Sequence, residues 1–104
     1  MRLSAVEARA VAQLRLGQHD LTLDDLTAAV AEQPLDERFR ELLMLALYRS
    51  GRAAAALEVY RQTRVLLADE LGVDPALPLQ VLHRSILHAR DVPVRPVPGL
   101  PVRA

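Results

Sequence analysis

Two glycines, Gly17 and Gly51, each follow a run of helix-forming residues and lie 34 residues apart. Glycine favours the end of a helix because it adopts the left-handed backbone conformation there without a side-chain penalty. The same offset pairs further residues: Ala12 with Ala46, Leu23 with Leu57, and Leu26 with Tyr60. Self-similarity at this period is typical of stacked pairs of helices, as in tetratricopeptide repeats, so we expect a helical repeat.

Capping residues predict the bounds of the first two helices. Ser4 and Glu7 form a capping-box pattern, in which a hydroxyl and a carboxylate satisfy free backbone N–H groups where a helix begins. We expect this helix to end at the first of the two glycines. Asp20 or Thr22 is the predicted N-cap of the second helix. That helix should end before Pro34, because the residue preceding a proline disfavours helical geometry.

Similar signals predict three more helices. Asp36 is the expected N-cap of the third, which should end at the second glycine. The fourth should begin near Arg52 and end at Gly72. The pair Asp74 and Pro75 then predicts the start of the fifth, because proline suits the first helical position.

The composition supports an all-α fold. Aromatic residues are limited to one Phe and two Tyr, which would suit a β-sandwich poorly. In the second unit, residues of suitable size stand where a tetratricopeptide unit needs medium, medium, small and large side chains: Leu43, Leu47, Ala56 and Tyr60. Arg40 at a large aromatic position and Thr22 at a small position depart from that pattern. We predict a tetratricopeptide-like repeat of about five antiparallel helices.

The character of the chain changes after Arg90. Four prolines interrupt the remaining residues, at positions 93, 96, 98 and 101. Proline cannot continue a helix and favours extended backbone. We therefore predict a helical domain over residues 1–90 and a Pro-rich tail or linker over residues 91–104. Binding of an SH3-like partner by the prolines is the less favoured interpretation.

Several stretches resemble a known family. They are residues 38–52, residues 55–61, residues 66–75 with their Leu-Gly-Val-Asp-Pro ending, and residues 82–87. Together they resemble the bacterial transcriptional activator domain of the SARP-type regulators of actinobacteria, over about residues 5–90. The resemblance implies a tetratricopeptide-like domain that follows a DNA-binding winged helix. Nothing in these residues resembles a winged helix, so the chain is either a fragment or a short reading frame without its DNA reader.

The chemistry-bearing residues do not predict a catalytic or metal site. There is no Cys, and the three histidines are His19, His83 and His88. His83 and His88 lie about 140° apart around a helix, so they do not share a face. The acidic pairs at residues 24–25 and 69–70 have no converging base, nucleophile or phosphate loop. We expect no enzyme activity, no cofactor and no metal.

Charge and hydropathy set the expected location and one alternative function. The formal net charge is zero, which argues against autonomous DNA binding. No apolar run approaches the ~20 residues that span a bilayer, so we expect a cytoplasmic chain without membrane contact. Direct nucleic-acid binding by a cluster of arginines around the second glycine is an alternative function. These arginines are Arg49, Arg52, Arg61 and Arg64. Pairing of Glu58 with Arg61 or Arg64 on a solvated helix face is the simpler interpretation.

The concave wall of the repeat is the preferred binding site, because the first helix of each tetratricopeptide pair lines that wall. The first unit contributes Glu7, Val11, Leu14 and Arg15. The second unit contributes Arg38, Glu41, Leu45, Tyr48 and Arg49. Exposed Leu45 and Tyr48 would be apolar anchors among charges, which suits protein recognition. If helices of the intact regulator bury them, their role is structural.

The resemblance and the groove together predict the function. We expect a non-enzymatic protein-interaction or oligomerisation domain of a transcriptional activator, in the control of a secondary-metabolite (antibiotic) pathway. Its expected partners are a second copy of itself, an attached or partner DNA-binding domain, and the transcription machinery. DNA would be reached only indirectly, through a winged-helix domain that this chain lacks. A nonfunctional fragment without that domain is the further alternative.

Overall fold

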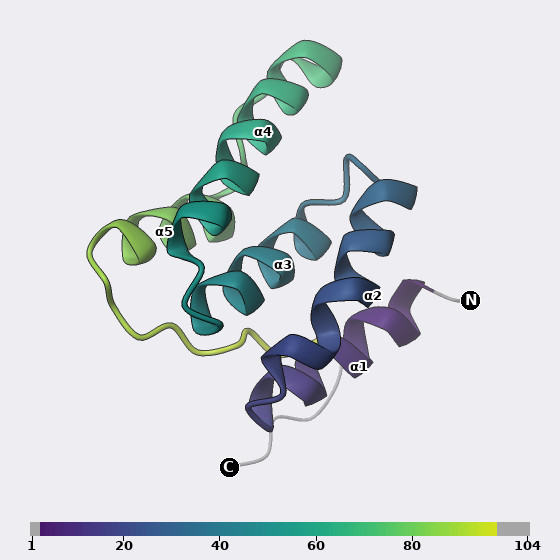
Figure 1. Cartoon of the computed structure of the whole chain (residues 1–104). Coiled ribbons are helices and arrows are strands. Elements are labelled where there is room, and N and C mark those ends of the chain that lie inside the picture. Colours follow the sequence, from purple (N-terminus) through teal and green to yellow (C-terminus); the bar gives the residue numbers. More distant parts are fainter. Residues whose placement is uncertain (1–2, 98–104) are drawn as a thin grey trace.

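The computed structural model describes residues 3–97, with side chains from residue 5 onward. All regular elements in this part of the chain are helices, which confirms the predicted fold class. They are α1 (Leu3–Arg15), α2 (His19–Glu32), α3 (Glu37–Arg49), α4 (Ala53–Leu71) and α5 (Leu77–Leu87). None of these helices combines the length and apolar character that crossing a membrane requires. Helices α1 and α2 form one pair, α3 and α4 a second, and α5 packs against α3 and α4 (Figure 1).

Helix α3 is the centre of the molecule because it contacts all four other helices. Every residue from 39 to 47 is buried, whatever side of the helix it occupies. Met44 and Ala46 are the least exposed of these, both at 0%, and Leu42 follows at 1%. A helix that is buried all round needs neighbours on every side, which a stack of helix pairs supplies and a single hairpin does not.

The turns after α1 and α3 are equivalent, as the spacing of the two glycines predicts. Gly17 and Gly51 both have positive φ angles, of +77° and +80°. In each turn the glycine N–H donates to the carbonyl three residues earlier, and the next N–H donates to the carbonyl five residues earlier. The pairs are Gly17–Leu14 and Gln18–Gln13 after α1, and Gly51–Tyr48 and Arg52–Leu47 after α3. These are the two bonds of the Schellman motif.

A third turn of the same kind follows α5, although it contains no glycine. Ala89 has a φ of +53°, and its N–H donates to the carbonyl of Ile86. The N–H of Arg90 donates to the carbonyl of Ser85, five residues earlier. Helix α5 therefore ends as α1 and α3 do. Residues 90–97 follow it as an extended segment.

Some predicted helix starts are correct and others are not. Asp36 caps α3 as predicted, since its Oδ1 accepts from the N–H of Phe39 at 3.2 Å. Ser4 lies inside α1, which the structure describes from Leu3; its side chain lies outside the described side chains, so the hydroxyl contact is not defined. The predicted cap of α2 is wrong, because the helix begins at His19, before both Asp20 and Thr22.

Where a predicted helix start is wrong, the structure shows contacts or burial that depend on residues distant in sequence. Asp20 accepts a hydrogen bond from the Ser50 hydroxyl at 3.2 Å, and Thr22 is fully buried. Helix α5 begins at Leu77, later than the Asp-Pro pair predicts. Its cap comes from α3, where the carboxylate of Glu37 accepts from the N–H of Ala76 at 2.7 Å. A carboxylate can thus satisfy a helix start from another element.

Arg40, the departure from the repeat pattern, is a buried structural residue. Its Nε donates to the carbonyl of Pro34 at 2.8 Å, and its Nη1 donates to the Thr63 hydroxyl at 3.0 Å. The guanidinium thereby joins the α2–α3 connection to α4. Burial lowers the pKa of Arg40, because a low-dielectric surrounding disfavours the charged form.

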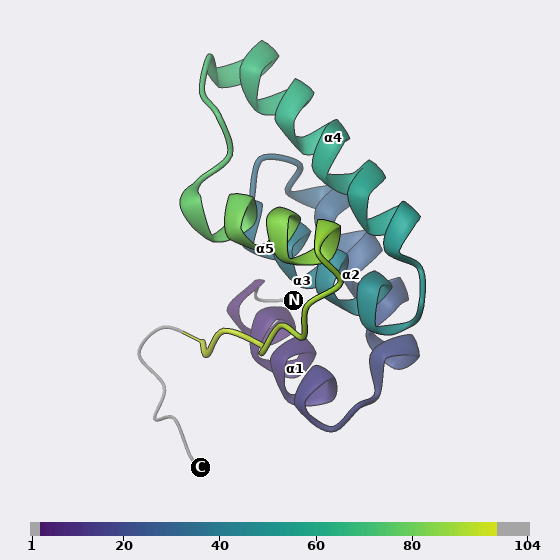
Figure 2. The same cartoon turned by 90° about the vertical axis from the view of Figure 1, so that its left-hand side faces the viewer.

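The Pro-rich residues after α5 are extended, as predicted, and residues 92–97 pack against the helices. Val94 is buried, and Val92 and Val97 are partly buried against the same core cluster. Figure 2 shows this yellow-green segment running from the end of α5 across α1. The expected tail thus lies on the helices as far as residue 97. The domain boundary at residue 90 stays a prediction.

Candidate partner-binding groove

Three of the predicted groove residues form a network of charges between α1 and α3. The Nε of Arg38 donates to Glu7 Oε2 at 2.8 Å, and its Nη1 donates to Glu41 Oε2 at 3.1 Å. The side chains of Arg38 and Glu41 are only 15% and 10% exposed. Because two carboxylates accept from its guanidinium, Arg38 is held in place between α1 and α3.

The extended segment completes this network. Nη2 of Arg38 donates to the carbonyl of Arg95 at 2.6 Å, with a longer contact of 3.5 Å to the carbonyl of Pro96. The Arg95 side chain returns to Glu41, with Nε and Nη2 each 2.7 Å from a carboxylate oxygen. Hydrogen bonding to Glu41 raises the pKa of Arg95. The groove therefore holds four alternating charges, of which the last comes from the segment.

A second set of contacts holds the segment near the end of α5. The Tyr48 hydroxyl donates to the carbonyl of Arg90 at 2.8 Å. Arg49 donates from Nη2 to the carbonyl of Val92 at 2.6 Å and from Nη1 to the carbonyl of Leu14 at 3.1 Å. Burial lowers the pKa of Arg49, and the nearby charge of Asp91 partly opposes that shift. Arg49 thus ties α1, α3 and the segment together.

The floor of the groove is apolar and closed. Val11, Leu14 and Leu45 are each 3% exposed or less, and they share one core cluster with Val94 of the segment. The prediction that Leu45 is an exposed anchor is therefore wrong. Tyr48 is partly buried and contacts the segment with its hydroxyl. The predicted residues other than Arg15 lie together, and the extended segment of the same chain lies against them.

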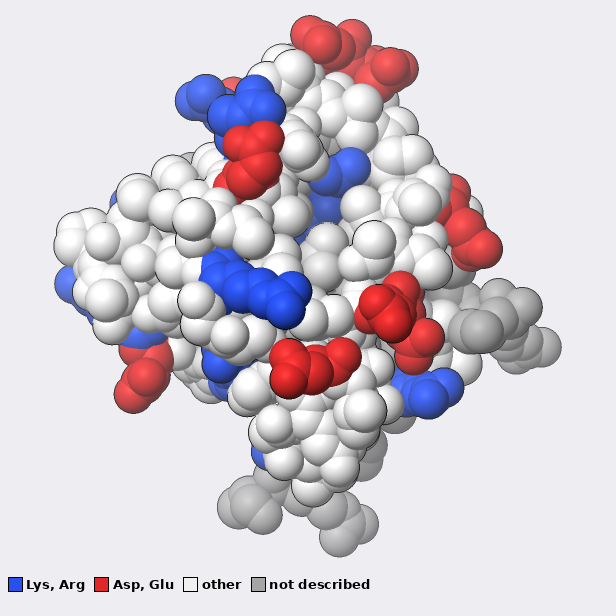
Figure 3. Space-filling view, viewed as in Figure 1, with Lys and Arg blue, Asp and Glu red and all other residues white. Residues whose placement is uncertain are grey.

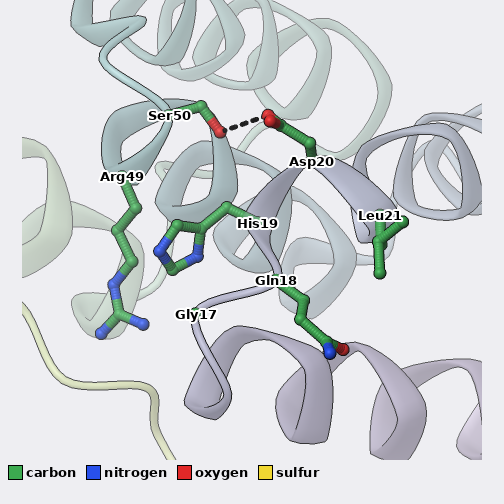
Figure 4. A pocket seen from close by; sticks show the side chains of 7 residues that line it. All are labelled: Gly17, Gln18, His19, Asp20, Leu21, Arg49 and Ser50. Atoms are coloured by element: carbon green, nitrogen blue, oxygen red, sulfur yellow. Dashed lines mark hydrogen bonds between the residues drawn. The ribbon is translucent and has the colours of Figure 1, made fainter.

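Arg15 lies apart from these contacts and lines a cavity beside Tyr48 and Arg49. This cavity, of about 620 Å³, is also lined by Asp91 and Val92 of the segment. A neighbouring pocket of about 480 Å³ lies between the α1–α2 turn and the end of α3. Figure 4 shows His19 and Arg49 facing the same space in that pocket, with the hydrogen bond from Ser50 to Asp20 at its rim.

The described residues hold no group of three His, Asp or Glu side chains placed to bind a metal. His83 stacks on Tyr60 with the ring centres 3.8 Å apart, which joins α5 to α4. Burial lowers the pKa of His83, and the positive charge of Arg64 adds to that shift. At the end of α5, Nδ1 of His88 lies 2.8 Å from the carbonyl oxygen of Arg84, four residues earlier.

The predicted arginine cluster is divided between different roles. Arg49 is directed into the groove, as described above, whereas Arg61 pairs with Glu58 at 2.6 Å on the exposed face of α4. This hydrogen bonding lowers the pKa of Glu58 and raises that of Arg61. Figure 3 shows acidic and basic side chains interspersed over this face, with no continuous basic surface.

Sequence reasoning missed Val94 and Arg95, the segment residues that occupy the groove. A signal was available, because Val92 and Val94 stand two residues apart in a stretch where proline enforces extended backbone. Residues two apart share a face in a β-type backbone, and residues three apart do so in the polyproline conformation. Valines at positions 92, 94 and 97 therefore indicate a buried side of the segment.

The family described as "Bacterial transcriptional activator domain" matches residues 1–87 of the chain. The chain belongs to this family. It is 58% identical over 88 residues to "Regulatory protein AfsR" of Streptomyces coelicolor, a match that covers 85% of this chain and 9% of that protein. It is 42% identical over 103 residues to "Regulatory protein DnrI" of Streptomyces peucetius, covering 99% of this chain and 38% of that protein. These matches confirm the resemblance to SARP-type regulators.

A solved structure also resembles this activator domain. It is described as "Mycobacterium tuberculosis EmbR in complex with low affinity phosphopeptide". The superposition has a TM-score of 0.81 at 34% sequence identity and covers 83% of this chain and 23% of that chain. Like the matches above, it shows that this chain spans a small part of the proteins it resembles.

Proposed function

We propose that this activator domain is a non-enzymatic protein-interaction module of a transcriptional activator, and that its α1–α3 groove is the contact surface. The observation that carries the proposal is the binding of an extended protein segment in that groove through Arg38, Tyr48 and Arg49. The Arg38 side chain is preorganised for this task by Glu7 and Glu41. Preorganised donors bind a peptide at a lower entropic cost than mobile ones.

Transcriptional control is supported by the names of the relatives. Besides the two regulators above, the chain is 47% identical over 98 residues to "Transcriptional regulator RedD" of Streptomyces coelicolor. In our proposal DNA is contacted by a winged-helix domain, and the groove contacts that domain, a partner subunit or the transcription machinery. The regulated genes are those of a secondary-metabolite pathway, which is what the SARP resemblance implies.

Self-association is the second part of the proposal and would use α5. Leu77 and Val81 lie one helical turn apart and are 65% and 47% exposed. Apolar side chains grouped on one helix face support contact with another protein surface. Changing both residues to serine should shift the chain toward monomer in analytical ultracentrifugation, and an unchanged sedimentation profile would exclude this face.

Groove variants introduced at the chromosomal gene test the interaction function. Arg38→Ala with Arg49→Ala removes the donors to three segment carbonyls and should lower transcripts of the target genes. The matched control, Arg61→Ala with Arg64→Ala, removes two exposed guanidiniums from α4 and should leave transcripts unchanged. Immunoblotting verifies equal protein levels. Equal transcript levels in both strains would contradict the proposal.

Direct nucleic-acid binding by the arginine cluster is not supported by the dispersed charges described above. A shift assay on the chain at low salt is the direct check, because phosphate contacts are strongest there. We expect no shifted band. A band that disappears as salt is added would favour the alternative function.

A further inference from the structure

Residues 90–97, hereafter the groove segment, contact the helices as a bound peptide would. The segment contains no helix and crosses α1 and α3 in extended form (Figure 2). Its partners Arg38, Glu41, Tyr48 and Arg49 are the same side chains that tetratricopeptide geometry assigns to a ligand-binding wall. The structure therefore shows what kind of occupant this wall accepts.

Backbone recognition is the first requirement that the wall places on an occupant. Four carbonyls of the groove segment accept hydrogen bonds from three wall side chains: those of Arg90, Val92, Arg95 and Pro96. Within the described residues, the backbone hydrogen bonds between the segment and the wall all use segment carbonyls as acceptors. Proline has no N–H to donate but keeps its carbonyl. A proline in the occupant therefore loses none of the hydrogen bonds that the wall donates.

Side-chain recognition is the second requirement. Val94 is 8% exposed and inserts into the apolar floor. The next residue, Arg95, forms a two-point pair with Glu41, whose side chain is 10% exposed. A bidentate pair of this kind distinguishes arginine from lysine, because only a guanidinium matches both carboxylate oxygens. The wall thus selects an aliphatic residue followed by arginine.

The groove segment is held by few contacts, but its covalent attachment favours it over a free peptide. Its contacts depend on few side chains, and Arg95 remains 48% exposed while paired. The segment is covalently joined to α5, so it competes with a free peptide at an effective concentration on the order of millimolar. A partner peptide at micromolar concentration would enter only when the segment is released.

We propose that the groove segment is an exchangeable, built-in ligand that controls access to the groove. The occupant that replaces it is an extended segment of a partner protein, with an aliphatic residue followed by arginine and with flanking prolines. This inference rests on the proposed interaction function and specifies its partner and its regulation.

A peptide-binding measurement on the full chain tests the proposal. The variant Val94→Asp with Arg95→Glu places negative charge against the apolar floor and against Glu41, and it should release the segment. A fluorescent peptide with the sequence of residues 90–97 is titrated against this variant and the unchanged chain. We expect at least ten-fold tighter binding to the variant. Circular dichroism and urea unfolding establish that both proteins keep the helical stack.

Two further measurements test the specificity. A peptide carrying Arg95→Lys should bind the released variant more weakly than the original peptide. Adding Glu41→Gln to the variant should remove most of that preference, because the two-point pair is lost. Arg61→Ala, on the far face of α4, is the matched control and should leave peptide binding as it is in the unchanged chain.

Two results would overturn the inference. One is a folded variant that fails to bind the peptide, since the groove would then not recognise this sequence. The other is equal binding to the variant and the unchanged chain, since the segment would then not compete. Either result could occur while the groove variants still lower transcripts in cells. In that case the interaction function would stand, and the first result would refute the identity of the ligand while the second would refute its control by the segment.

Discussion

The helical stack and the groove segment meet at α3, yet different interactions hold them. The stack consists of apolar side chains with almost no exposure, such as Leu26 and Met44 at 0%. The segment is held by one buried valine, hydrogen bonds to its carbonyls and the pair between Arg95 and Glu41. Apolar burial is cooperative over the whole core, whereas a few polar contacts can break locally. The segment should therefore detach without unfolding of the stack.

The turns that precede α2, α4 and the groove segment allow the helical stack and the segment to be compared directly. All three have the same pair of backbone hydrogen bonds. Glycine occupies the left-handed position in the first two, and Ala89 occupies it in the third. The backbone path after α1, α3 and α5 is thus shared, and the residues that follow it determine whether a helix or an extended segment forms. After α5 the prolines prevent a helix and favour the extended segment.

The largest effect should follow from damage to the stack. Leu42 is 1% exposed in the centre of α3, so Leu42→Ala leaves a cavity that the neighbours cannot fill. We expect a loss of about 2–5 kcal/mol in the free energy of unfolding, measured by urea titration. Leu16→Ala, at a site 72% exposed, is the control and should change stability by less than about 0.5 kcal/mol. Equal losses in both variants would refute the assigned core.

The turns offer a smaller, paired test. A Cβ at Gly51 would meet no atom within 4 Å, so Gly51→Ala costs only the strain of the left-handed backbone, about 1 kcal/mol. Ala89→Gly relieves the same strain. Its gain should be smaller, about 0.5 kcal/mol, because glycine also has more freedom in the unfolded chain. Thermal unfolding of the two variants should show shifts of opposite sign, and shifts of the same sign would disprove the equivalence of the turns.

The sequence predicted features whose cause is local. Gly17, Gly51 and Gly72 end helices because the left-handed conformation depends on the residue itself. Asp36 caps α3 because its acceptor reaches an N–H three residues away. Such contacts need no knowledge of the rest of the fold. The 34-residue spacing of Gly17 and Gly51 then predicted that the helices stack in pairs.

Features caused by distant residues were not predictable in the same way. Asp20 does not cap α2, and it accepts a hydrogen bond from Ser50 in the next helix pair. Helix α5 is capped by Glu37 from α3. The repeat predicted a wall of α1 and α3 residues, but it did not predict that Leu45 is buried or that residues 90–97 contact Arg38, Tyr48 and Arg49. Periodicity identifies a wall without showing what covers it.

Arg95→Ala should affect the segment and spare the stack. The partly exposed pair with Glu41 contributes about 1 kcal/mol or less, so the unfolding free energy should change little. Trypsin should cleave after Arg90 faster in the variant, because the released backbone fits the protease more easily. Salt at about 1 M should reduce the difference by screening the pair in the unchanged chain. Arg61→Ala serves as the control, and equal cleavage in all three proteins would show that Arg95 does not hold the segment.

Acid should weaken the stack through His83, with the smallest effect of the four. Burial lowers the pKa of His83 in the folded chain, and the charge of Arg64 adds to the shift. The unfolded chain therefore binds the proton more readily, so stability is complete above about pH 6.5 and falls as the pH drops below that value. His83→Gln should flatten the dependence of unfolding free energy on pH between about 7 and 5.5, and Arg64→Ala should flatten it in part. Arg95→Ala should keep the slope of the unchanged chain, because the segment lies outside the contact between His83 and Tyr60. An unchanged slope in His83→Gln would assign the acid sensitivity to other groups.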